Sequence, residues 1–238
     1  MSALLFLHIP KTGGTSLRTA MQGLFTESER CLIYPDGGKH VSQEEFKSLP
    51  ADQRARFRWI AGHFPFGLHR HLPGPSQYLT FVRNPLSRVP SLFNHHYQRP
   101  PQAHYTAIRD AGMTMRDFVL SGIEPSVDNG ITRFLSGMSA DFGCCTKEMM
   151  DLALENVREH FLLVGTMERY AESVAVLEAR LGVTLPPVEH LNRRRRGWVV
   201  ADKQAYKAII ELNEFDMVLY HAIKQDLRSQ AQPLKSAI

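Results

Sequence analysis

The sequence predicts an α/β fold in which helices flank a parallel sheet. Short apolar runs, typical of strands buried on both faces of such a sheet, recur at residues 4–9, 57–61, 78–82 and 161–165. Segments with apolar residues at helical spacing separate these runs. The first run also passes directly through a pair of glycines into a helical segment, as in nucleotide-binding α/β proteins.

The composition is that of an ordinary globular protein with a mild basic excess. A chain of 238 residues suits one α/β domain, which we expect to span residues 1–238 with about the last ten residues frayed. The net charge of +4 and the pI near 9.0 fit an anionic cofactor or polymer and do not single out nucleic acid. Three cysteines, two of them adjacent, argue against a disulfide framework and for a reducing compartment.

The first strand and the residues after it predict an anion-binding site. Pro10 ends the strand, and a helix with Leu17 and Met21 on its apolar face follows the turn. This order of elements directs backbone N–H groups and the positive end of a helix dipole to one place. The turn consists of Lys11, Thr12, Gly13, Gly14, Thr15 and Ser16. Its glycines allow the backbone to approach an anion closely, its lysine adds a mobile positive charge, and its hydroxyl groups add hydrogen-bond donors. Thr15 or Ser16 can also cap the helix.

The turn does not fit the ATP-type phosphate loop, because that motif places its lysine after the glycines. The stretch HIPKTGGTS instead closely resembles the 5′-phosphosulfate loop of sulfotransferases, most of all the branch with the heparan sulfate 2-O-sulfotransferases and other carbohydrate sulfotransferases. The resemblance extends over residues 4–224. It implies the sulfotransferase fold, a relative of the P-loop NTPase fold, and 3′-phosphoadenosine 5′-phosphosulfate (PAPS) as sulfuryl donor. It also implies 3′,5′-ADP as product, no metal, and a catalytic role for Lys11.

A histidine follows the second apolar run at a position where open α/β sheets bind ligands. Imidazole can accept a proton from a sugar hydroxyl near neutral pH. The related carbohydrate sulfotransferases have a Gly-His step here whose histidine is their proposed general base, which implies that role for His63. His69 and His71 are the competing candidates, and a structural histidine is the alternative interpretation.

The third apolar run leads into a predicted phosphate-binding segment. The R-N-P sequence at 83–85 resembles the family's 3′-phosphate segment, which usually reads R-D-P and continues into a helix with a downstream serine. The resemblance implies that Arg83 and Ser91 hold the 3′-phosphate from two sides. Pro90 lacks an N–H and is expected to bend or delay this helix. Arg88 is expected on the helix surface.

Two further groups of basic residues have different interpretations. His95, His96 and His104 lie near one another in the chain, but no carboxylate or cysteine accompanies them at ligand spacing. We therefore predict no metal site and expect these histidines, together with Tyr97, to line an acceptor cleft. In the family a loop closes over the donor nucleotide where this chain has Arg193, Arg194, Arg195 and Arg196.

The remaining helices follow from capping residues and apolar spacing. Ser42 and Glu45 have the spacing of a capping box. Thr146 precedes a long apolar periodicity, and Gly182 ends another. The predicted helices are 42–50, 114–122, 146–160, 168–181, 203–213 and 214–227.

These observations favour a PAPS-dependent sulfotransferase that acts on a hydroxyl group of a carbohydrate, with a glycan and not nucleic acid as partner. A nucleotide kinase-like enzyme is one alternative, but it needs a strand-end aspartate for Mg²⁺ and a lysine after the glycines. A basic module that binds nucleic acid or acidic glycans through residues 193–196 is the other. The absence of a long apolar run predicts no membrane span. We expect a cytoplasmic, bacterial-type protein, or a Golgi-lumenal one if the chain is trimmed from a longer animal protein.

Overall fold

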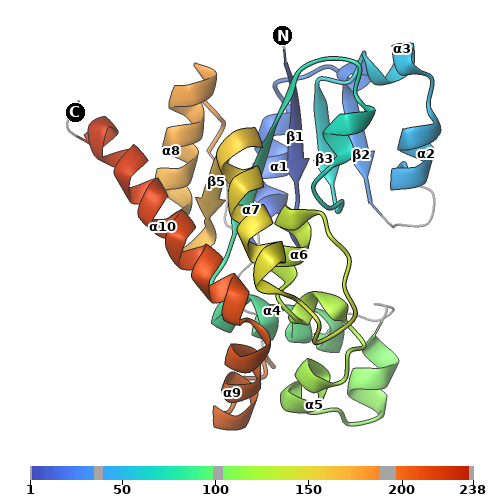
Figure 1. Cartoon of the computed structure of the whole chain (residues 1–238), viewed down its shortest axis with the longest axis vertical. Coiled ribbons are helices and arrows are strands. Elements are labelled where there is room, and N and C mark those ends of the chain that lie inside the picture. Colours follow the sequence, from blue (N-terminus) through green and yellow to red (C-terminus); the bar gives the residue numbers. More distant parts are fainter. Residues whose placement is uncertain (1, 35–39, 99–103, 188–196, 236–238) are drawn as a thin grey trace.

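The computed structural model describes residues 2–34, 40–98, 104–187 and 197–235. Within these residues one sheet contains five parallel strands in the order β2-β3-β1-β4-β5 (Figure 1). The strands are β1 (Ala3–Leu7), β2 (Arg30–Ile33), β3 (Trp59–Gly62), β4 (Ser76–Val82) and β5 (Phe161–Thr166). The predicted α/β fold with a parallel, helix-flanked sheet is therefore confirmed.

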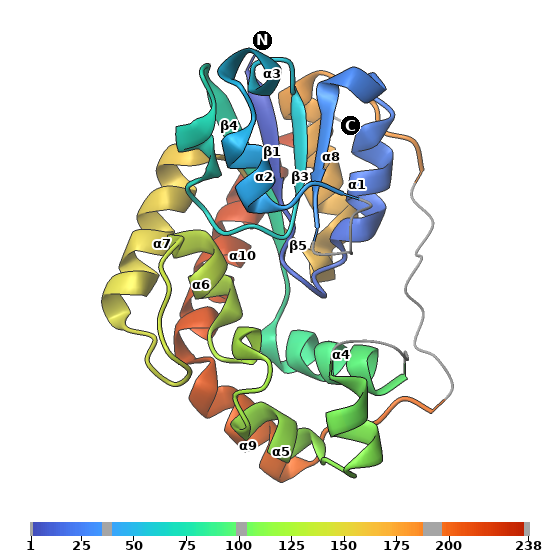
Figure 2. The ribbon, with the colours of Figure 1, turned by 90° about the vertical axis from the view of Figure 1, so that its right-hand side faces the viewer.

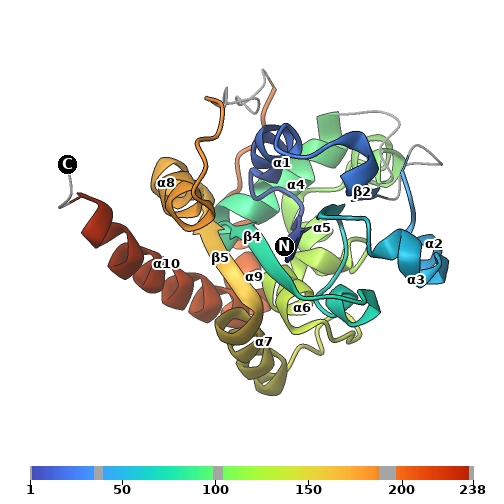
Figure 3. The ribbon, with the colours of Figure 1, turned by 90° about the horizontal axis from the view of Figure 1, so that it is seen from above.

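Helices cover both faces of the sheet, as Figure 3 shows from above. Two helices lie on one face, α1 (Gly14–Gln22) and α8 (Tyr170–Leu181). The other face is covered by α2 (Gln43–Ser48), α6 (Gly130–Ser136), α7 (Lys147–His160) and α10 (Glu214–Lys235). The central strand is buried on both sides, because Leu5, Phe6 and Leu7 are each 0% exposed. The strand order places the carboxyl end of β1 between those of β3 and β4.

A third group of helices lies beyond the carboxyl ends of the strands (Figure 2). It consists of α4 (Pro85–Gln98), α5 (Met115–Leu120) and α9 (Lys203–Leu212), which share an apolar cluster. Phe93 of α4 packs edge-on against Phe118 of α5 with ring centroids 5.5 Å apart. The remaining short helix, α3 (Ala51–Arg54), follows α2.

Local signals predicted most helix starts correctly. Ser42 and Glu45 form the predicted capping box, and Thr146 caps α7. Helix α4 is continuous through Pro90, so the expected delay does not occur. Strand β2 was not predicted, and α10 continues to Lys235, eight residues past its predicted end and through most of the segment expected to fray.

A buried ion pair joins three helices near the carboxyl ends of the strands. Arg88 of α4 is 0% exposed, which corrects the expectation that it lies on the helix surface. Its guanidinium lies 4.0 Å from the Asp216 carboxylate of α10, which is also fully buried. Asp216 accepts hydrogen bonds from the Ile131 and Thr132 amides at the start of α6 and from the Thr132 hydroxyl. Burial raises the pKa of Asp216, while Arg88 and these donors oppose the shift.

No helix in the described ranges is both long enough and apolar enough to cross a bilayer.

Candidate active site

The predicted anion-binding loop connects β1 to α1. Gly13 is the N-cap residue of α1 and has a left-handed backbone conformation with φ 84°, which glycine adopts without strain. Gly14 packs directly against β1, because a Cβ there would lie 2.4 Å from Cδ2 of His8. The N-cap residue Gly13 makes no side-chain capping bond, and among the described residues Thr15 and Ser16 do not have the predicted capping role. The first amides of α1 therefore remain oriented toward an anion at the helix N-terminus.

Two side chains of this loop have different environments. The Thr12 hydroxyl donates to the Ile9 carbonyl over 2.8 Å and is fully buried, so it stabilises the loop instead of offering a donor to a ligand. Lys11 is half-buried and has a φ of 68°, a conformation that costs a non-glycine residue roughly 1–2 kcal/mol. Such backbone strain is often found at ligand-binding sites.

Arg83 lies beside this loop, as the sequence predicts. It directly follows β4, and its Nη1 donates to the Lys11 carbonyl over 3.3 Å. Asn84 fixes the turn, because its side-chain Oδ1 accepts a hydrogen bond from the Leu86 backbone N–H and its backbone N–H donates to the Glu168 carboxylate. A guanidinium and a helix N-terminus thus meet at the carboxyl edge of the sheet, an arrangement suited to an anion with more than one phosphate group.

Ser91 lies farther along α4 and is 7% exposed. Nearby, Asn94 supports the helix around Pro90, since its Nδ2 donates to the Pro90 carbonyl over 2.8 Å. The Asn94 side chain also exchanges two hydrogen bonds with the backbone of Val199. Helix α4 is therefore tied to the segment that follows residues 188–196. Arg193, Arg194, Arg195 and Arg196 lie outside the described residues.

His63 follows β3 and lies beside the end of β1. Leu7 pairs with Gly62 in the sheet, so His8 and His63 occupy neighbouring positions just beyond the two strands. Gly62 is required by the packing of β2, because a Cβ there would lie 2.0 Å from the Ile33 carbonyl oxygen. The His63 ring is half-buried, and its Nδ1 lies 2.5 Å from the His8 carbonyl oxygen.

This hydrogen bond defines the tautomer of His63. A carbonyl oxygen only accepts hydrogen bonds, so Nδ1 carries the proton and Nε2 of the neutral ring has the free lone pair. Burial lowers the pKa of His63, the bond to His8 opposes this shift, and the positive charge of Arg18 adds to it. At neutral pH the ring is therefore uncharged and its Nε2 can accept a proton.

Sequence reasoning missed two residues that contact His63. His8 is 7% exposed, and its ring centroid lies 4.7 Å from that of His63. Tyr34, the first residue after β2, packs edge-on against His63 at 4.7 Å, and its hydroxyl bonds His8 Nδ1 over 2.8 Å. Burial, followed by the charges of His63, Arg18 and Lys11, keeps the pKa of His8 well below its ordinary value. Both residues position the His63 ring.

The competing histidine His69 belongs to the opposite edge of the sheet. Its Nδ1 bonds the Tyr78 hydroxyl over 3.0 Å, and its ring stacks on His160, the residue before β5. Two polar residues before and within α6 also have structural contacts. Asn129 accepts from the amides of Phe215 and Asp216, and Arg133 is paired with Asp128.

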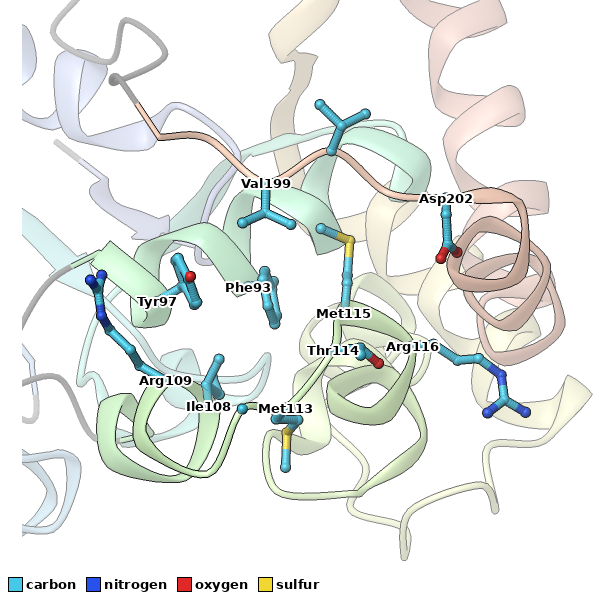
Figure 4. A pocket seen from close by; sticks show the side chains of 12 residues that line it. Phe93, Tyr97, Ile108, Arg109, Met113, Thr114, Met115, Arg116, Val199 and Asp202 are labelled. Atoms are coloured by element: carbon cyan, nitrogen blue, oxygen red, sulfur yellow. The ribbon is translucent and has the colours of Figure 1, made fainter.

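A cavity of about 290 Å³ lies between α4 and the segments around residues 108–116 and 199–202. Figure 4 shows Phe93 and Tyr97 of α4 facing it, with Val199 across from them. Tyr97 is thus the member of the predicted acceptor-cleft group that lines a cavity. Lys11, His63 and Arg83 are not among the described lining residues, so this cavity is separate from the anion-binding loop.

The fold and the loop define a class of protein: an α/β protein with a nucleotide-type anion site at the carboxyl edge of a parallel sheet. Residues 2–221 match the model of the Sulfotransferase family, so the chain belongs to this family. Mouse sulfotransferase SULT7A1, solved in complex with PAP, is similar at 16% identity and a TM-score of 0.40. That match covers 91% of this chain and 65% of SULT7A1. No curated protein matches the chain in sequence.

Proposed function

We propose that the protein transfers a sulfuryl group from PAPS to a hydroxyl group of a carbohydrate. The proposal depends mainly on one observation: three groups lie together at the carboxyl edge of the sheet. They are the uncapped N-terminus of α1, Arg83 bonded to the Lys11 carbonyl, and neutral His63 beside β1. Family membership supports PAPS as the donor. The resemblance of the HIPKTGGTS loop to the carbohydrate branch supports a sugar hydroxyl as the acceptor.

The donor is bound by three parts of the chain in this proposal. The backbone amides of residues 12–16 hold the 5′-phosphosulfate at the start of α1. Arg83 binds the 3′-phosphate, with Ser91 as a second donor from α4. One or two of the arginines at 193–196, which lie outside the described residues, contact the nucleotide in this proposal. The 3′-phosphate distinguishes this donor from ATP, so Arg83 determines the nucleotide preference.

Transfer is an in-line displacement in which the protein supplies position and charge. The acceptor oxygen forms a bond to sulfur, the bond from sulfur to the bridging phosphate oxygen breaks, and 3′,5′-ADP leaves. Lys11 neutralises the charge that develops on the leaving oxygen. Nε2 of His63 takes the hydroxyl proton on the opposite side. No step of this scheme requires a metal.

The kinase-like alternative has less support from this chain. A Mg²⁺-dependent nucleotide enzyme places a carboxylate near a strand end to hold the metal. The first residues after the five described strands carry no carboxylate: they are His8, Tyr34, His63, Arg83 and Met167. Glu168, the second residue after β5, has a carboxylate, but it accepts the hydrogen bond of the Asn84 backbone N–H.

The proposal is tested by incubating the protein with sulfur-labelled PAPS and a panel of glycans that differ in charge, including N-sulfated heparosan, chondroitin and neutral oligosaccharides. We expect label on at least one glycan and an equal amount of 3′,5′-ADP. Transfer of labelled phosphate from ATP, with none from PAPS, would contradict the proposal. Sulfuryl transfer to phenols or lipids alone would overturn the carbohydrate assignment and leave the donor assignment intact.

A further inference from the structure

Three side chains from separate segments meet at the far end of α4. His96 belongs to α4, His104 precedes the short π-helix η3 (Thr106–Asp110), and Glu124 precedes the 3₁₀ helix η4 (Pro125–Val127). One Glu124 oxygen, Oε2, lies 3.6 Å from His96 Nε2 and 3.8 Å from His104 Nε2. One ligand-type atom from each residue lies within 4.8 Å of the others.

This arrangement corrects the premise that no carboxylate accompanies these histidines. Glu124 follows His104 by 20 residues, which is outside the usual spacing of a sequence motif. The fold of the intervening segment, η3 and α5, brings it back to α4. The burial of His96 also differs from the expectation that it faces an open acceptor cleft, since this residue is only 6% exposed.

His96 has no hydrogen-bond partner within the described part of the chain. Neither of its ring nitrogens makes a hydrogen bond there, and the 3.6 Å to Glu124 is too long for one. Buried polar groups are normally satisfied. Asn94, one half-turn earlier on the same helix and equally buried, uses its amide fully in bonds to the backbone. The free nitrogen of His96 directed at Glu124 therefore indicates a missing partner between them.

The carboxylate is prepared to act as a ligand. The Ser126 amide donates to Oε1 over 3.2 Å, which orients the carboxylate and leaves Oε2 for the two histidines.

The two distances from Glu124 to the histidine nitrogens are close to those between ligands of a tetrahedral metal ion, and the third separation, between the two histidines, is within 4.8 Å. Bond lengths of roughly 2.0–2.2 Å to nitrogen and oxygen place neighbouring ligand atoms about 3.4 Å apart in a tetrahedral site. The observed separations of 3.6 and 3.8 Å need only a few tenths of an ångström of closure. Two imidazoles and one carboxylate suit zinc and other first-row divalent ions, whereas Mg²⁺ and Ca²⁺ prefer oxygen ligands.

We propose that His96, His104 and Glu124 bind one divalent transition-metal ion, preferably Zn²⁺, with a fourth position for water. His96 is the twelfth residue of α4, about 16 Å along the helix from Pro85. The ion is therefore distant from the sulfuryl-transfer chemistry and has a structural role. It fastens the segments before η3 and η4 to the helix that begins directly after Arg83.

The test uses the full-length protein after dialysis against a chelator. Competition with a chromophoric chelator measures the Zn²⁺ stoichiometry and Kd, and Co²⁺ reports the ligand geometry through its visible absorption. We expect one Zn²⁺ per chain and a tetrahedral Co²⁺ spectrum. Zinc at a hundred times its Kd should raise Tm by about 5–10 °C.

Variants assign the ligands. Glu124→Gln and His104→Ala should each weaken zinc binding at least tenfold and abolish the Co²⁺ spectrum, and both residues are exposed enough for these changes to be tolerated. His95→Ala is the matched control on the same helix and should bind zinc like the wild type. Absence of stoichiometric binding in the stripped wild type would overturn the proposal. Equal affinities in Glu124→Gln, His104→Ala and the wild type would overturn it too.

Discussion

Replacing His63 by asparagine separates its two proposed functions. In the wild type the Nδ1–H donates to the His8 carbonyl over 2.5 Å, which fixes the ring beside β1. An asparagine amide N–H can make the same hydrogen bond. Asparagine has no basic lone pair in place of Nε2, so it cannot take the proton of the acceptor hydroxyl. The substitution therefore removes the base with little change in local structure.

The size of the effect follows from the protonation state of the histidine. Burial lowers the pKa of His63 below its ordinary 6.5, so at pH 7.5 more than about nine-tenths of the rings are neutral and able to act as a base. His63→Asn should therefore remove the full contribution of a general base and lower turnover about 10²–10⁴-fold. This corresponds to about 2.7–5.4 kcal/mol in activation free energy. The affinity for 3′,5′-ADP should hardly change.

The assay measures initial rates of transfer from PAPS to a saturating sugar acceptor, together with the Kd of 3′,5′-ADP. His69→Asn is the matched control, because His69 lies at the opposite edge of the sheet and should leave the rate unchanged. In the wild type, the rate should decrease at low pH as His63 becomes protonated, and the midpoint of this decrease should lie below pH 6.5 because the pKa of His63 is lowered. Full turnover in His63→Asn, or an acid limb centred above pH 7, would refute the assignment.

Three further substitutions test other parts of the structure. Arg83→Ala should weaken 3′,5′-ADP binding by about 2–4 kcal/mol, or 30–1,000-fold, in calorimetry, and equal affinity would remove its phosphate role. Lys11→Ala and Lys11→Gly should each lower turnover about 10²–10³-fold. In urea denaturation the glycine variant should have a free energy of unfolding about 1 kcal/mol higher than the alanine variant, because glycine adopts the φ of 68° without strain. Asp216→Asn should lower the free energy of unfolding by about 3–5 kcal/mol, because Arg88 is left as an unpaired buried charge; a loss under about 1 kcal/mol would contradict this.

The parts of the site that sequence could predict are those encoded within a few residues. The strand, glycines and helix start around Lys11 follow one another directly, as do β4, Arg83 and the start of α4. His63 follows a strand whose apolar run is unmistakable. In each case the elements meet at the carboxyl edge simply because parallel strands all end there.

The parts that sequence missed depend on distant contacts. Strand β2 is an edge strand of four residues that begins with an arginine, so it lacks the apolar run of the other strands, and Tyr34 directly follows it. Arg88 is a residue type expected at the surface, and its burial depends on distant partners: the Asp216 carboxylate, 128 residues further on, and the Ser126 carbonyl, which accepts a hydrogen bond from it. Likewise Glu124 reaches His96 of α4 and His104 through the fold and not through any spacing in the chain.

The most direct test of the PAPS assignment is calorimetric titration of the protein with 3′,5′-ADP, 5′-AMP and ATP, each with and without Mg²⁺. We expect 3′,5′-ADP to bind more tightly than 5′-AMP by the contribution of one phosphate contact, about 2–4 kcal/mol, with no dependence on Mg²⁺. In Arg83→Ala this preference should disappear. Tighter binding of ATP in the presence of Mg²⁺ would contradict the assignment and favour a kinase-like enzyme, and binding of none of the three would exclude a nucleotide-dependent transfer altogether.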